Sequence, residues 1–143
     1  MTIWFDMDGT IADLYGVENW LDYLLAEDTT PYDIAKPLVN LSYLARLLNQ
    51  AQRAGYEVGI VSWLAREKSA FYDELVTESK LGWLNQHLKS VNWDKILIVP
   101  YGTDKLNVTG GGILFDDEEP NRTNWGDGAF EPNKIFEVLR NLM

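Results

Sequence analysis

The sequence predicts an α/β protein with a mostly parallel sheet that is covered by helices on both faces. Short apolar runs alternate along the 143-residue chain with segments of helical periodicity. Most of the apolar runs stop at a polar residue, as expected of buried strands that end at a ligand-binding edge. Hydrophobic residues make up 46% of the chain, which is enough to form a core and excludes global disorder.

Five strands are expected. They cover residues 2–5, 56–61, 95–99 and 113–115 and, as a short edge strand, 129–130. The third run ends at Pro100, and Gly110 to Gly112 form a tight turn before the fourth. Because helical segments separate these runs, the connections are long enough for parallel pairing through right-handed crossovers.

Helical periodicity covers four segments, which are residues 19–26, 38–54, 64–90 and 132–142. Gly55 follows the second segment as a C-cap, and the third is expected to break near Gly82. Residues 27–37 contain two prolines and two adjacent threonines, so they are expected to form a loop. No linker or repeat is visible. Residues 1–143 are therefore expected to form a single domain with a small insert at about 13–37.

The charge balance excludes several partners. Lys and Arg number 12 against 22 Asp and Glu, and the formal net charge of −10 argues against a broad basic surface for duplex nucleic acid or an anionic membrane. A small anion held at one local site remains compatible with this charge. The chain has no cysteine, hence no disulfide and no thiolate metal site. No apolar run is long enough to span a membrane and the first residues lack a basic signal start, so a cytoplasmic location is expected.

Polar side chains follow three of the predicted strands. Asp6 and Asp8 follow the first, Ser62 follows the second, and Asp116 with Asp117 follows the fourth. The carboxyl ends of parallel strands meet at one edge of a sheet, so we expect these side chains to converge. Four carboxylates at one edge repel one another and require a positive charge. Mg²⁺ fits this need because it prefers oxygen ligands, and no His or Cys cluster indicates zinc.

Such an arrangement is suited to phosphoryl transfer. Asp6 can attack phosphorus to form an aspartyl-phosphate, while Asp8 can protonate the leaving oxygen and then deprotonate water. We expect Thr10, Ser62 and Lys105 to bind the phosphate. The acidic pair of residues 116–117 is expected to hold the metal.

Two assignments have alternatives. Lys105 is preferred as the site lysine because it shortly precedes the fourth strand, but Lys80 and Lys95 compete with it. The aromatic residues that can contact a substrate, with packing as the alternative for each, are Trp20, Tyr23, Tyr32 and Trp63.

At these residues the sequence resembles the haloacid dehalogenase (HAD) superfamily of phosphohydrolases. TIWFDMDGT is similar to its motif I, the Ser of GIVSW to motif II, Lys105 to motif III and ILFDD to motif IV. The resemblance extends over nearly the whole chain. It implies a Rossmannoid three-layer sandwich with strand order 5-4-1-2-3, a minimal cap at residues 13–37, and Mg²⁺ held by Asp6, the Asp8 backbone carbonyl and Asp116, with Asp117 nearby.

Within that superfamily, the stretch from KLGWLNQHL to GILFDD resembles 5′(3′)-deoxyribonucleotidases. This implies a Mg²⁺-dependent phosphomonoesterase whose partner is a small phosphorylated substrate, with (deoxy)nucleoside monophosphates as the expected class. A minimal cap leaves the site open, so a phosphatase of nucleic acid ends or of another small phosphoester is the first alternative. The second is a phosphoacceptor switch resembling a response-regulator receiver. Receivers carry their acidic pair at the first strand and the acceptor at the third, whereas here the DxD pair follows the first strand and the other acidic pair follows the fourth.

Overall fold

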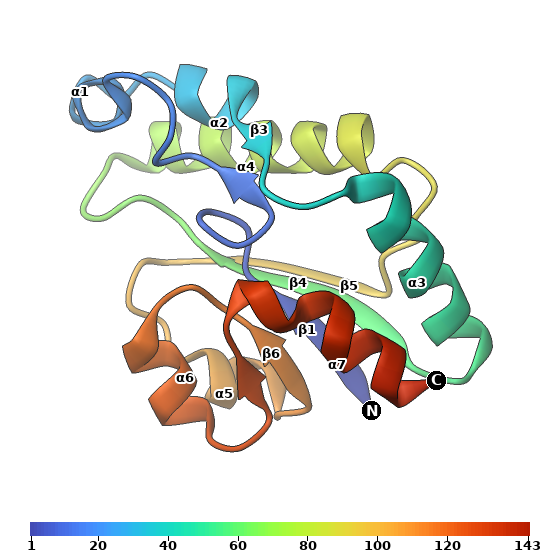
Figure 1. Cartoon of the computed structure of the whole chain (residues 1–143). Coiled ribbons are helices and arrows are strands. Elements are labelled where there is room, and N and C mark those ends of the chain that lie inside the picture. The colour runs from blue at the N-terminus through green and yellow to red at the C-terminus, as the bar shows by residue number, and fades with distance from the viewer.

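The computed structural model describes residues 1–143 as a five-stranded parallel sheet with helices on both faces (Figure 1). All four strand pairings in this sheet are parallel, so the predicted α/β class is confirmed. Its strands are β1 (Thr2–Phe5), β4 (Glu57–Trp63), β5 (Lys95–Val99), β6 (Ile113–Phe115) and β7 (Ala129–Phe130).

The order across the sheet is β5-β4-β1-β6-β7, with β1 in the centre. These labels differ from the expected 5-4-1-2-3 because the chain has seven strands rather than five. The two additional strands, β2 (Ala12–Asp13) and β3 (Lys36–Pro37), pair antiparallel in a separate two-stranded sheet. Two residues are too few to show the alternating pattern by which a strand is recognised in a sequence.

The helices depart from expectation in several places. The structure has α1 (Trp20–Leu25), α2 (Thr30–Ile34), α3 (Leu41–Arg53), α4 (Ala70–His87), α5 (Lys105–Thr109), α6 (Glu119–Trp125) and α7 (Ile135–Leu142). The expected break near Gly82 is wrong, because α4 runs through it, and α4 begins later than predicted because Ser69 caps it by accepting the Tyr72 N–H. The expected loop at 27–37 contains α2 and β3, and the short α5 and α6 were not predicted.

Alternation along the central strands divides the core into two layers. Ile3 and Phe5 face the main cluster, to which α3, α7 and the end of α4 contribute. Trp4 points to the opposite face and packs with Leu114 and with Trp125 of α6. Both faces of the sheet are therefore buried, which leaves its edge at the carboxyl ends of the strands as the place for a site.

The segment between β1 and α3 carries α1 and α2, which lie beside α4 (Figure 1). Its residues 13–37 are called the insert below. The Glu27 carboxylate accepts hydrogen bonds from the Ser69 N–H and hydroxyl at 2.9 and 2.7 Å, and the Tyr72 hydroxyl donates to the Asp28 carbonyl at 2.9 Å. These bonds fix the insert to the first turn of α4. No helix of the chain combines the length and the apolar character that crossing a membrane requires.

Candidate active site

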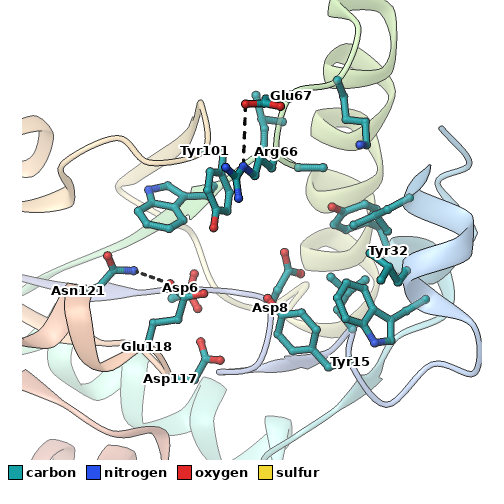
Figure 2. A pocket seen from close by; sticks show the side chains of 18 of the residues that line it. Asp6, Asp8, Tyr15, Tyr32, Arg66, Glu67, Tyr101, Asp117, Glu118 and Asn121 are labelled. Carbon is teal, nitrogen blue, oxygen red and sulfur yellow. Dashed lines mark hydrogen bonds and ion pairs between the residues drawn. The ribbon is translucent and has the colours of Figure 1, made fainter. Parts of the chain in front are cut away.

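The polar residues at the strand ends meet at the carboxyl edge of the sheet, at the bottom of a cavity (Figure 2). Asp6 directly follows β1, and Asp116 directly follows β6, which pairs with β1. Ser62 lies near the end of β4, on the other side of β1, and Lys105 opens α5. Neighbouring parallel strands thus bring together residues that lie far apart in the sequence.

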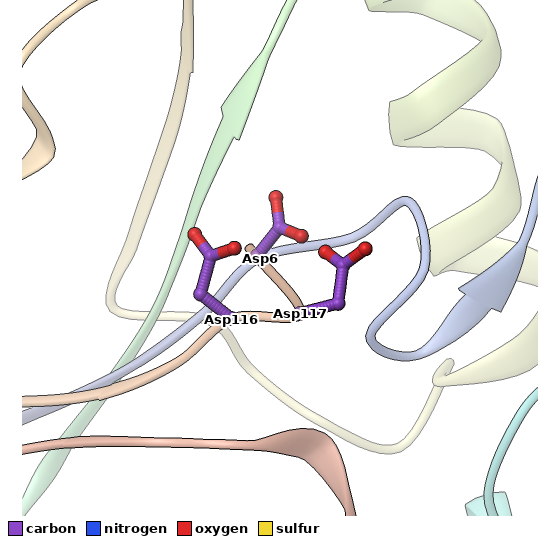
Figure 3. Close-up of side chains that lie close together, drawn as sticks. All are labelled: Asp6, Asp116 and Asp117. Atoms are coloured by element: carbon purple, nitrogen blue, oxygen red, sulfur yellow. The ribbon is translucent and has the colours of Figure 1, made fainter. Parts of the chain in front are cut away.

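Asp6, Asp116 and Asp117 form a carboxylate cluster (Figure 3). One oxygen from each lies within 4.8 Å of the others. Asp6 and Asp116 are buried, and Asp117 is half-buried. Burial and, after it, the charge of Asp6 raise the pKa of Asp116 to about 6 and the pKa of Asp117 to about 8. The cluster therefore binds protons or a cation more readily than isolated aspartates do.

Lys105 is bound to this cluster, as predicted for the site lysine. Its buried ammonium lies 2.9 Å from Asp6 Oδ1 and 2.7 Å from Asp116 Oδ2. Burial lowers the pKa of Lys105, but the charges of both carboxylates and their hydrogen bonds outweigh that effect, and the net shift is upward. Asn121 adds an N–H donor to Asp116 Oδ2 at 3.1 Å, and the backbone N–H of Glu118 donates to Asp116 Oδ1 at 2.9 Å.

Lys80 is a second lysine in the site, and the sequence had placed it only as an alternative. Its side chain is 1% exposed, and its ammonium makes three short contacts, to Asp8 Oδ2 at 2.9 Å, Ser62 Oγ at 2.6 Å and the Trp63 carbonyl at 2.8 Å. The three donors of the ammonium are thereby all used. Lys95, the third candidate, is exposed and pairs with Glu57 at 3.5 Å.

A signal for Lys80 exists in the sequence. Val76 and Tyr72 precede it at intervals of four residues, and all three side chains are buried on one face of α4. A lysine in the apolar stripe of a helix requires a buried partner. That partner is Asp8, whose carboxylate lies outside the carboxylate cluster. Burial raises the pKa of Asp8, and the nearby Lys80 partly counteracts this effect.

Ser62 and Thr10 lie beneath the cavity surface. Ser62 is fully buried and accepts a hydrogen bond from Lys80, which leaves its own hydroxyl hydrogen available for another acceptor. Thr10 is also fully buried, and its hydroxyl contacts Asp6 Oδ2 at 2.9 Å and Asp117 Oδ1 at 3.4 Å. The structure therefore places the Thr10 hydroxyl against Asp6 and Asp117 of the carboxylate cluster.

The cavity above these groups has a volume of about 490 Å³. The insert forms one wall with apolar and aromatic residues, among them Trp20 and Tyr32, and residues 63–68 with Tyr101 form a second wall. Trp20 and Trp63 line it as expected. Tyr23 does not, because residues 20, 21, 24 and 25 form the face of α1 that borders the cavity.

Two further aromatic residues, Tyr15 and Tyr101, line the cavity, and neither is predicted from the sequence. The Tyr15 ring packs edge-on against Trp20, with ring centroids 4.9 Å apart, and Tyr101 packs against Trp63 at 4.9 Å. Both lie in irregular segments. No periodicity identifies such residues, so only the tertiary structure brings them to the site.

The donor set of the cluster fits a hard divalent cation. Three carboxylates offer oxygen atoms close enough to share one ion, and no His or Cys accompanies them. Mg²⁺ is typically held by one or two carboxylates together with water and substrate oxygens. Asp8 is not part of this group through its side chain, which binds Lys80 instead.

The fold and the site define a class: an α/β protein with an acidic, lysine-containing site at the carboxyl edge of a parallel sheet. No family model matches the chain, and no curated protein matches it in sequence. Among solved structures it is similar to a chain of "Structure of Pnkp1/Rnl/Hen1 complex", with a TM-score of 0.57 and 18% sequence identity. The match covers 91% of this chain but 44% of that one, so the chain spans less than half of its neighbour's length. At this identity the likeness shows a shared fold.

Proposed function

We propose that the chain is a Mg²⁺-dependent phosphomonoesterase of the HAD type that acts through an aspartyl-phosphate. One observation carries the proposal: Asp6, Asp8 and the acidic pair of residues 116–117 share the bottom of one cavity with the buried Lys105, and a second buried lysine, Lys80, binds Asp8 from behind the cavity lining. A cavity that holds this many ionisable groups is costly to maintain without a charged ligand.

The charges are suited to a phosphate. With Asp8 protonated for its role as general acid, the three carboxylates of the cluster and the ammonium groups of Lys80 and Lys105 leave a formal charge of −1, which one divalent cation changes to +1. A phosphate dianion then meets no net repulsion. Asp6, Asp116 and Asp117 would hold the cation, which when bound neutralises charge on the phosphoryl oxygens.

The residues divide the chemistry between them. A carboxylate oxygen of Asp6 attacks phosphorus, the ester P–O bond breaks, and the leaving oxygen takes the proton of Asp8. Water then attacks phosphorus and gives a proton back to Asp8, the bond between phosphorus and the Asp6 oxygen breaks, and inorganic phosphate leaves. Lys105 and the free hydroxyl hydrogen of Ser62 supply positive charge and a donor to the phosphoryl oxygens. Thr10 orients Asp6 through the contact at 2.9 Å.

(Deoxy)nucleoside monophosphates are the substrates we propose. Support comes from the aromatic side chains in both cavity walls, Trp20 and Trp63 among them, and from the resemblance to 5′(3′)-deoxyribonucleotidases. The chain is proposed to be a single domain in which residues 13–37 act as a reduced cap.

A second candidate substrate is the phosphate at a nucleic acid end. Arg66 and Lys68 line the cavity and can contact a neighbouring phosphate, and the structural neighbour comes from a Pnkp1/Rnl/Hen1 complex. Glu67 and Glu118 also line the cavity, and the net charge of −10 opposes an extended polyanion. Competition between thymidine 5′-phosphate and a 3′- or 5′-phosphorylated oligonucleotide distinguishes the two, because a preference for the oligonucleotide would exclude the mononucleotide assignment.

The test of the activity is release of phosphate from p-nitrophenyl phosphate and thymidine 5′-phosphate with Mg²⁺. Asp6→Asn should abolish release while circular dichroism shows an unchanged fold, and Asp127→Asn, at an exposed position, should retain it. Full activity in Asp6→Asn would exclude the mechanism. A stable aspartyl-phosphate without turnover would instead indicate the receiver-like switch.

A further inference from the structure

The cavity has room for much more than a phosphate group. Its volume of about 490 Å³ lies within the range of roughly 300–1,000 Å³ that proteins use for whole organic ligands. The carboxylates and Lys105 lie at the bottom, so the remaining space faces the part of a substrate from which phosphate would be removed. The chemistry of that space is set by the insert.

Tyr32 is the unusual member of the insert wall. Its side chain is 4% exposed, yet its hydroxyl makes no hydrogen bond with any group of the chain. The buried side-chain polar atom without a partner in this chain is Trp93 Nε1, so the Tyr32 hydroxyl is not sealed in the core but open to the cavity that Tyr32 lines. The neighbouring Tyr72, in the same small apolar cluster, has an internal partner instead, because its hydroxyl donates to the Asp28 carbonyl at 2.9 Å.

The unpaired hydroxyl points into the cavity. Tyr32 lines it, and Figure 2 shows the hydroxyl directed toward the open space above Asp8. The ring is fixed from below, because the Lys80 ammonium lies 5.4 Å from the ring centroid and is itself bound to Asp8. The hydroxyl therefore belongs to the Asp8 side of the cavity, opposite the carboxylate cluster.

Its surroundings define what it can bind. Leu14 and Leu24 of the insert pack in the same cluster as Tyr32 and offer no polar group to a ligand. Burial and the charge of Asp8 raise the pKa of Tyr32 above its ordinary value, so the phenol keeps its proton and donates. A ligand that satisfies this position combines an apolar body with an oxygen acceptor.

We infer that Tyr32 is a specificity-determining residue of a leaving-group subsite, where its hydroxyl donates a hydrogen bond to a second oxygen of the alcohol from which phosphate is removed. The inference rests on the proposed function, since Asp8 marks the leaving-group side only if it protonates the leaving oxygen. The class of substrate is a phosphate monoester of an alcohol with a flat or apolar body and a further hydroxyl, ether or carbonyl oxygen. Simple aryl phosphates lack that second oxygen.

The test compares kcat/KM of the whole chain with Mg²⁺ for thymidine 5′-phosphate, thymidine 3′-phosphate and phenyl phosphate. In Tyr32→Phe, the ratio of kcat/KM for the better nucleotide to that for phenyl phosphate should fall about tenfold, as expected for the loss of one hydrogen bond. Tyr23→Phe, on the face of α1 away from the cavity, should keep the wild-type ratio. An unchanged ratio in Tyr32→Phe would overturn the inference.

Two outcomes separate this inference from the proposed function. A wild-type chain that cleaves phenyl phosphate but neither nucleotide would overturn the subsite and leave the proposed chemistry unaffected, whereas one that cleaves none of the three would contradict the proposed function itself.

A stability measurement adds a readout independent of activity. Tyr32→Phe should melt at the wild-type temperature because no internal hydrogen bond is lost, and Tyr72→Phe should melt lower. A Tyr32→Phe protein destabilised as much as Tyr72→Phe would show that the Tyr32 hydroxyl has an internal partner.

Discussion

The Lys80 ammonium lies 2.9 Å from the Asp8 carboxylate, which is not a member of the carboxylate cluster. This pair separates the two aspartates of the DMDGT motif into different electrostatic environments. Asp6 is bound to Lys105 within the carboxylate cluster, whereas Asp8 belongs to a separate group with Lys80 and Ser62. Distinct environments for two nearby carboxylates permit distinct chemical roles.

Removing Lys80 should destabilise the protein and disable the site. Lys80→Met leaves Asp8 without its cation, and the loss of one partner of a buried ion pair costs about 3 kcal/mol in the free energy of unfolding. Denaturant unfolding measures this change. Lys95→Met is the matched control, because Lys95 is 46% exposed and should change stability by less than about 1 kcal/mol. Equal stability of the two variants would contradict the structural role assigned to Lys80.

Magnesium should stabilise the fold through the carboxylate cluster. At a concentration one hundred times the dissociation constant, an ion that binds only the folded chain adds about 2.7 kcal/mol to the free energy of unfolding. A thermal shift titration with MgCl₂ measures the effect. Asp117→Asn should reduce the shift strongly, and Asp127→Asn should retain it. An unaltered shift in Asp117→Asn would exclude Asp117 from the ion site.

Metal-free protein should become more stable as the pH falls from about 8 to 6. In the folded chain the pKa values of Asp116 and Asp117, about 6 and about 8, lie above the ordinary value of 3.8. The folded state therefore binds protons more tightly than the unfolded state, and the repulsion present above pH 8 disappears as the pH falls through these values. Melting temperatures in EDTA should be higher at pH 6 than at pH 8.5, and Asp117→Asn should reduce the difference. The stabilisation by Mg²⁺ should show the opposite dependence, since the ion displaces those protons.

Gly9 should tolerate no side chain. Gly102, which has a similar φ, is the matched control that separates backbone strain from the close approach to Asp117. Gly9 and Gly102 have φ values of +81° and +85°, so alanine is strained by about 1–2 kcal/mol at either position. A Cβ at Gly102 meets no atom within 4 Å, whereas a Cβ at Gly9 collides with the Asp117 carboxylate. Gly9→Ala should therefore lose more stability than Gly102→Ala and should also lose the Mg²⁺ response. Equal losses in both variants would show that the close approach to Asp117 has no effect.

Much of the architecture could be predicted because it depends on local patterns. The sheet strands β1, β4, β5 and β6 are largely apolar runs, and Asp6, Ser62 and Asp116 lie at or near strand ends that parallel pairing brings to one edge. The predicted bounds failed where elements are very short, as for β2 and β3, or where a side-chain cap sets the start, as Ser69 does for α4.

The site was harder to predict where its residues depend on long-range contacts. Lys80 lies 18 residues from Ser62 and 72 from Asp8, and nothing in the local sequence pairs them. Thr10 is predicted to bind phosphate, and in the structure its hydroxyl donates to Asp6. Thr10 and Ser62 both carry a chemically suitable hydroxyl. The hydrogen bonds that leave one of them free are specified only by the tertiary structure.

The most direct test of the central claim is to look for phosphate on Asp6 itself. The wild-type chain is mixed with thymidine 5′-phosphate and Mg²⁺, quenched in acid within the first turnover, and its N-terminal peptide is analysed by mass spectrometry. The proposed mechanism predicts a phosphorylated Asp6 that is absent when the substrate or Mg²⁺ is omitted. Release of phosphate with no covalent phosphate on any aspartate would contradict it.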